Sequence, residues 1–186
     1  MSRPMTASAE VARIQNALPF WITLILVPLV WTGALQGGWM LFLAPVYALA
    51  LTSILDQISG LNTANPDPET PEASLFWYRL ITLVWFPLQI VTQLGLIWYA
   101  TRAAHLSGAE KALLFYNVGL MAGGVGIVYA HELMHQRTKL ERWLGDLLMA
   151  SVLYSHFRSE HLLVHHIHVG TPKDPVSARY NEGFHR

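Results

Sequence analysis

Five histidines in two short clusters are the residues of this chain whose types and spacing could do chemistry. The first cluster is HELMH, with His131 and His135, and the second is EHLLVHH, with His161, His165 and His166. In an α-helix, residues four apart differ by about 40° of rotation, so His131 and His135 share a face and can reach one ion. His161 and His165 repeat that spacing.

His166 follows its neighbour by about 100° of rotation, so the second cluster can present imidazoles in two directions. That arrangement suits a second metal or a bridging geometry better than one closed tetrahedral site. Neutral imidazole suits iron, zinc, copper and nickel, so residue type alone does not choose the metal. Because the chain has no cysteine, any metal must be held by nitrogen and oxygen.

HELMH also fits the HExxH signature, in which two histidines bind zinc and the glutamate, here Glu132, acts as general base. A membrane zinc metalloprotease is therefore one alternative. The three further histidines of EHLLVHH exceed what one catalytic zinc with three protein ligands requires, and they favour a two-metal site. A non-catalytic metal-binding membrane fragment is a third hypothesis.

Several polar residues near the clusters are candidates either for ligation or for a supporting role. Glu132 and Glu160 could ligate or bridge a metal, or orient a ligand imidazole, and His156 and His168 could either ligate or hydrogen-bond to a ligand. Asp146 lies in a short apolar segment, where an ionisable group is costly, and Arg142 one turn earlier could neutralise it. We expect no role for His105, in a polar loop, and assign none to His185.

The composition indicates an integral membrane protein. The 186 residues are 53% hydrophobic and 13% charged, with a mean hydropathy of +0.33, whereas ordinary soluble domains are about 25% charged. The formal net charge is zero and the sequence contains no basic run, which excludes a nucleic-acid-binding surface.

Four apolar stretches are long enough to cross a bilayer, which takes about 20 helical residues. They cover residues 17–35, 37–55, 75–100 and 112–130, with a tight hairpin at Gln36–Gly38 and an acidic, proline-rich loop at Asp56–Ser74. Leu144–Phe157 is apolar but too short to span, which predicts a re-entrant or interfacial helix. The sequence therefore predicts one all-α membrane domain over residues 1–186, with four transmembrane helices followed by a histidine-box region.

The basic residues predict the orientation. With four spans, the amino terminus, the 56–74 loop and everything after Ala130 share one side. That side carries ten of the twelve Lys and Arg residues when Arg79 is included. By the positive-inside rule the histidines face the cytoplasm.

Three segments in order, HELMH, SHFRSEHLLVHH and GTPKDPVSAR, resemble the histidine-box region of the membrane-bound alkane monooxygenases. These enzymes are related to xylene monooxygenase and the integral-membrane fatty acid desaturases. DQISGLNTANP is similar to that family's acidic loop, so the resemblance runs from about Asp56 to Arg186. HELMH alone would not be specific, but the coupled boxes followed by TPKDP are.

The resemblance implies a non-haem di-iron centre whose ligands include His131, His135, His161, His165 and His166, with Asp174 as a further supporting residue. It implies O2-dependent hydroxylation of the terminal methyl of medium-chain alkanes, with electrons from rubredoxin and an NADH-linked rubredoxin reductase. Alkyl-aromatic and fatty-acyl substrates remain alternatives. The location implied is the bacterial inner membrane. The family's third box, HxxHH, is expected beyond Arg186, so the chain looks like the amino-terminal part of a longer enzyme, inactive alone.

Overall fold

The computed structural model describes residues 14–59 and 75–183, and within them it is helical, with no strands. Four continuous helical stretches are long and apolar enough to cross a membrane: Ala17–Gln36, Gly38–Ser59, Phe76–Ala100 and Gly108–Met134. The prediction of an all-α protein with four transmembrane helices is confirmed.

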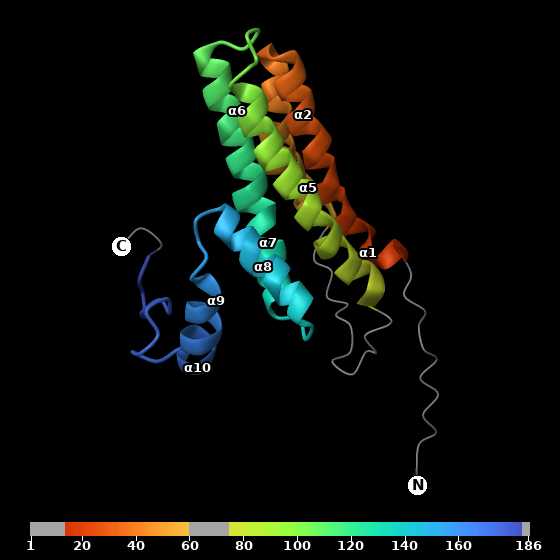
Figure 1. Cartoon of the computed structure of the whole chain (residues 1–186). Helices are drawn as coiled ribbons and strands as arrows, with labels where there is room; N and C mark the ends of the chain where they lie inside the picture. The colour runs from red at the N-terminus through yellow and green to blue at the C-terminus, as the bar shows by residue number, and fades with distance from the viewer. Residues whose placement is uncertain (1–13, 60–74, 184–186) are drawn as a thin grey trace. The chain divides into compact units, whose positions relative to one another are not determined.

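The spans contain α-, 3₁₀- and π-helical segments in succession. The first two are α1 (Ile14–Trp21), η1 (Ile22–Ile25), α2 (Leu26–Gln36), η2 (Gly38–Phe42), α3 (Leu43–Pro45), the π-helical η3 (Val46–Leu51) and α4 (Thr52–Ser59). The third span is α5 (Phe76–Ala100). The fourth comprises α6 (Gly108–Leu120), the π-helical η5 (Met121–Gly126) and α7 (Ile127–Met134). Figure 1 shows α2, α5 and α6 lying side by side.

Three ends of the spans lie four residues from the expected ones, and one of them is the end of the fourth span, at Met134 rather than 130. The fourth span begins at Gly108 rather than 112, because Ser107 and Glu110 form a reciprocal capping box at its first turn. The second runs on to Ser59, so the expectation of a loop from Asp56 was wrong for its first four residues. The helix continues through these four residues because extending a helix that has already formed adds one hydrogen bond per residue without a new nucleation cost. The rest of that loop, residues 60–74, lies outside the described residues.

Buried polar side chains form hydrogen bonds both within a helix and between helices of the spans. The Trp85 indole donates to Gln89 Oε1 at 2.7 Å, and the Asn117 amide donates to the Leu41 carbonyl at 2.7 Å. Gly126 lies so close to Gln89 that a Cβ there would be 2.0 Å from Oε1. At the predicted hairpin, Gly37 and Gly38 both have positive φ, +67° and +57°, a conformation suited to glycine.

The chain divides into two compact units, residues 1–129 and 130–186, with the boundary inside α7. The second unit contains both histidine clusters. It comprises the end of α7, α8 (Lys139–Ser151), α9 (Phe157–Glu160), the π-helical η6 (His161–His165) and α10 (His166–His168). The expectation of a single membrane domain stays a prediction.

α8 corrects the expected Leu144–Phe157 helix. It begins five residues earlier, because the Thr138 hydroxyl accepts a hydrogen bond from the Glu141 amide and caps the helix. It ends at Ser151, and Leu153 then adopts a left-handed φ of +62° that no regular helix can include.

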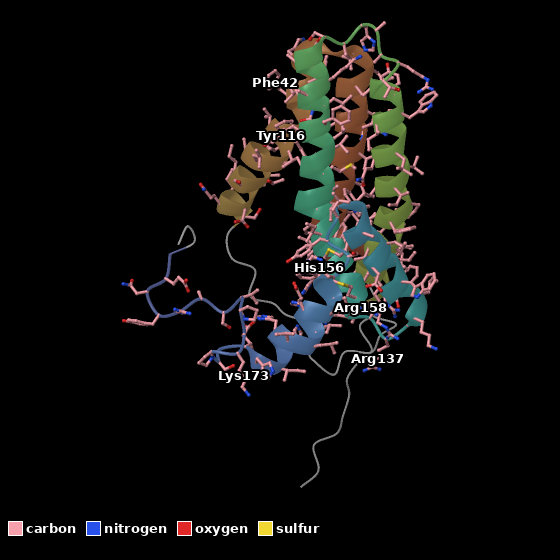
Figure 2. The ribbon with its side chains drawn as sticks, turned by 60° about the vertical axis from the view of Figure 1, so that its left-hand side comes forward. Phe42, Tyr116, Arg137, His156, Arg158 and Lys173 are labelled. Atoms are coloured by element: carbon pink, nitrogen blue, oxygen red, sulfur yellow. The ribbon has the colours of Figure 1, made fainter. Side chains whose placement is uncertain are left out.

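The expected pairing of Asp146 with Arg142 was also wrong. The carboxylate of Asp146 lies 2.9 Å from Arg158 of α9, which Figure 2 labels. Arg142 instead donates to the carbonyls of Gln136 and Arg137, at 3.1 and 2.7 Å, just after α7 ends. Arg142 therefore satisfies two carbonyls of the turn that connects α7 to α8.

Candidate metal centre

The first pair of histidines lies at the end of α7, with His131 in its last turn and His135 directly after its last residue, Met134. His131 and His135 are one helical turn apart, and their Nε2 atoms lie 3.3 Å from one another. The shared face that the i, i+4 spacing predicted is therefore present.

The second cluster is built on a π-helical turn, which the spacing argument did not foresee. Hydrogen bonds in a π-helix run from residue i to i+5, so residues five apart come together. The amide of His166 donates to the carbonyl of His161, and the two Nε2 atoms lie 3.0 Å apart. His166 therefore turns toward His161, while His165 contacts Asp174 through Nδ1, and the use of the second cluster for two metals stays a prediction.

Three imidazole nitrogens converge across the two clusters. The Nε2 atom of His161 lies 2.8 Å from that of His131 and 3.2 Å from that of His135, and the three form a group able to hold a metal ion. Two nitrogens bound to one ion at about 2.1 Å lie about 3.0–3.4 Å apart. A neutral imidazole carries only one ring proton, so three Nε2 atoms this close together cannot all be satisfied by hydrogen bonds to one another. A bound cation would accept the lone pairs of all three. The donor set therefore fits a metal.

The electrostatics of the cluster favour neutral imidazoles. Burial, and then the neighbouring His131 and His166, lowers the pKa of His161 to about 4. Burial and the same two neighbours also lower the pKa of His135. Both rings are neutral at pH 7, and a neutral ring has the lone pair that a metal requires.

His165 is held by a buried carboxylate. Its Nδ1–H donates to Oδ2 of Asp174 at 2.8 Å, and the Asp174 side chain is fully buried. Asp174 also accepts from the Ser177 hydroxyl, at 2.5 Å, and from the Val176 amide, at 3.2 Å. Burial alone would raise the pKa of Asp174, but these hydrogen bonds outweigh it and lower the pKa. With the proton on Nδ1, the Nε2 lone pair of His165 is available to a metal.

The other candidate supporting residues are less engaged. Glu132 lies 3.8 Å from His131 Nδ1, with its side chain 57% exposed. His156 and Glu160 form an exposed pair with each other at 3.7 Å. His168 accepts a hydrogen bond from Thr171 through its backbone carbonyl. His105 contacts the Ala34 carbonyl at 3.2 Å in the first unit, and His185 lies outside the described residues.

Sequence reasoning missed Phe157. Its ring stacks on His161, with centroids 4.9 Å apart and an interplanar angle of 13°. The available signal was its position four residues before His161, since residues four apart on a helix are neighbours. This contact restricts the rotation of the His161 imidazole, which lies close to the histidines of the first cluster as well as to those of its own.

A separate cavity of 330 Å³ lies in the first unit. Its walls include Tyr47, Ala48 and Leu49 of η3 and Gly124 and Val125 of η5, so both π-helical segments of the spans line it. The Tyr47 hydroxyl donates to a backbone carbonyl at 2.6 Å. Apart from Thr23 and Thr52, the other side chains that line it are apolar, which suits an apolar ligand.

The helical spans and the paired histidine clusters describe an integral-membrane protein with a candidate metal centre. The fatty acid desaturase family model matches residues 109–186, so this part of the chain is similar to that family. No solved structure matches the chain.

More particularly, the relatives are alkane monooxygenases. Alkane 1-monooxygenase 1 of Pseudomonas aeruginosa is 38% identical over 141 residues, which cover 72% of this chain and 36% of the relative. Alkane 1-monooxygenase 2 of the same organism is 33% identical over 89% of this chain and 46% of its own length, and alkane 1-monooxygenase 2 of Alcanivorax borkumensis is 30% identical over 90% and 46%. The resemblance to the membrane-bound alkane monooxygenases is thereby confirmed. The chain spans less than half the length of these relatives.

Proposed function

We propose that this chain provides the membrane helices and part of the metal centre of an O2-dependent alkane monooxygenase, which hydroxylates the terminal methyl of medium-chain alkanes. The observation that carries the proposal is the convergence of both histidine clusters on one point, in a chain similar to alkane 1-monooxygenases over most of its length. Iron is the metal that this similarity favours.

Five imidazoles fit two ions better than one. If a single ion were bound by His131, His135 and His161, the Nε2 atoms of His165 and His166 would bind no metal. The Nε2 atom of His166 lies only 3.0 Å from that of His161. We therefore assign His165 and His166 to a second iron. When bound, the iron pair would supply the activation of O2.

The remaining work belongs to the chain's own residues. Uncharged imidazoles bind the ions without cancelling their charge. Asp174 keeps the His165 proton on Nδ1, and Phe157 holds the plane of His161. The mostly apolar cavity beside Ala48 suits one unbranched alkyl chain, since its volume is at the lower end of the about 300–1,000 Å³ typical of small-molecule sites.

We further propose that the histidines face the cytoplasm at the bacterial inner membrane, where rubredoxin and an NADH-linked rubredoxin reductase deliver electrons. The distribution of Lys and Arg supports this orientation. A reporter fused after Arg186 tests it, and reporter activity on the periplasmic side would contradict both the topology and the electron route.

A membrane zinc protease is the second candidate, because His131, His135 and His161 alone form a three-histidine group with Glu132 beside them. Metal analysis of the purified product of the reading frame that contains this sequence, in nanodiscs after anaerobic loading with Fe(II) or Zn(II), separates the two. Two irons per chain, falling to one in His166→Ala, support the di-iron assignment. One tightly held zinc that His166→Ala leaves in place supports the protease.

The activity itself is tested with the reading frame that contains this sequence, expressed in membranes and supplied with octane, O2, rubredoxin, its reductase and NADH. We expect 1-octanol. Alanine substitution of each of the five histidines should abolish the product and lower the iron content, whereas His105→Ala should do neither. Metal binding without any product would favour a non-catalytic metal-binding protein.

A further inference from the structure

α8 has two opposite faces, and both are largely apolar. One face is buried and comprises Glu141, Gly145, Leu148 and Met149. The other, which we call the outer face of α8, comprises Leu140, Trp143 and Leu147, whose exposed fractions are 66%, 70% and 47%. Their spacing of three and four residues places them in one stripe along the helix. A helix that served only to cover the metal centre would place polar residues there.

α8 packs against the end of the fourth span, which is long and apolar enough to cross a membrane. Gly145 packs against the last turn of the fourth span, where a Cβ on it would lie 2.8 Å from the Ala130 carbonyl oxygen and 3.1 Å from the Met134 amide. Only four residues separate the end of α7 from the start of α8. Such a short connection makes neighbouring helices antiparallel. α8 therefore runs back alongside the end of a helix that crosses the membrane.

We propose that the outer face of α8 lies in the lipid interface, against headgroups and the first part of the acyl chains. The stripe is apolar and has no charge within it, so it lacks the charged groups that a soluble electron-transfer partner would recognise. Trp143 has the amphipathic ring that is enriched at membrane interfaces. Lys139, exposed at the edge of the stripe, can extend its ammonium group to lipid phosphates. This proposal is independent of the metal and of the reaction.

The absence of cysteine from the chain makes a direct test possible. Single cysteines are introduced at each position from 139 to 151, labelled with a nitroxide, and reconstituted in vesicles of phosphatidylethanolamine and phosphatidylglycerol at three to one. Collision rates are then measured with O2, which concentrates in lipid, and with a water-soluble nickel chelate. Val91→Cys, exposed on the third span, is the lipid control, and Tyr180→Cys, fully exposed in the second unit, is the water control.

We expect the ratio of O2 to nickel collisions to peak at 140, 143 and 147, with values there close to that of Val91→Cys. Brominated lipids should also quench more of the total tryptophan fluorescence in the native chain than in Trp143→Phe. Nickel accessibility at all three positions like that of Tyr180→Cys would overturn the proposal. So would spin–spin broadening at 143, which would show that a second copy of the chain covers this face.

Discussion

Asp174→Asn tests the most specific contact of the candidate metal centre. In the native chain the carboxylate accepts three hydrogen bonds, from His165 Nδ1–H, the Ser177 hydroxyl and the Val176 amide. An asparagine can keep the bond from Val176 through its oxygen, but its NH2 group then meets two donors. His165 can restore a hydrogen bond only by moving its proton to Nε2, which removes the lone pair available to a metal.

The expected result is weaker metal binding with little change in fold. Loss of a carboxylate that orients a ligand imidazole typically costs 10- to 100-fold in metal affinity. We expect a loss of metal affinity of this size in Asp174→Asn, because the Asp174 side chain is fully buried and water cannot take its place. The affected ion should be the one that His165 binds, so about half of the bound iron should become exchangeable with a chelator while the other half stays.

The assay is a competitive titration of the chain in nanodiscs with Fe(II) and a chromophoric chelator, with circular dichroism as a check on folding. Ser177→Ala is the matched control, since it removes one hydrogen bond from Asp174 and leaves the bond to His165. We expect a smaller change than in Asp174→Asn, about two- to tenfold, the size of one neutral hydrogen bond. A well-folded Asp174→Asn protein that binds both irons as tightly as the native chain would refute the role assigned to Asp174.

Three further predictions concern the other contacts. Asp146→Arg and Arg158→Asp should each weaken iron binding about two- to fivefold, the range of a partly exposed ion pair. The double variant with the charges exchanged should restore binding. If it binds iron no better than either single variant, the ion pair does not hold α9 in place. Ala48→Phe should shift hydroxylation toward shorter alkanes by filling the cavity, whereas Ala50→Phe, outside the cavity lining, should leave the product profile unchanged. Equal product profiles in the two variants would show that the substrate does not bind in this cavity. Gly126→Ala should destabilise the bundle by about 1–3 kcal/mol, because its Cβ would overlap Gln89, and a thermal melt in detergent unchanged from the native chain would contradict the packing described.

The four spans and the first histidine pair could be predicted from the sequence because they depend on local properties. An apolar run of about 20 residues must form a helix in lipid, where unpaired backbone groups are costly. The i, i+4 spacing of His131 and His135 likewise places them on one face of any α-helix. Local capping signals were present too, at Ser107 and Thr138, and would have located the starts of α6 and α8.

The tertiary structure decided the rest of the site. The π-helical turn at His161–His165 brought His166 to His161, whereas α-helical geometry would have turned it away, and nothing in the composition of that segment requires the wider turn. Asp146 pairs with Arg158, twelve residues later in the sequence, rather than with Arg142 on its own helix. In both cases the outcome depends on which segments meet after α7 and α8 fold back on one another. Local periodicity can place a residue on a face, but only packing determines what that face contacts.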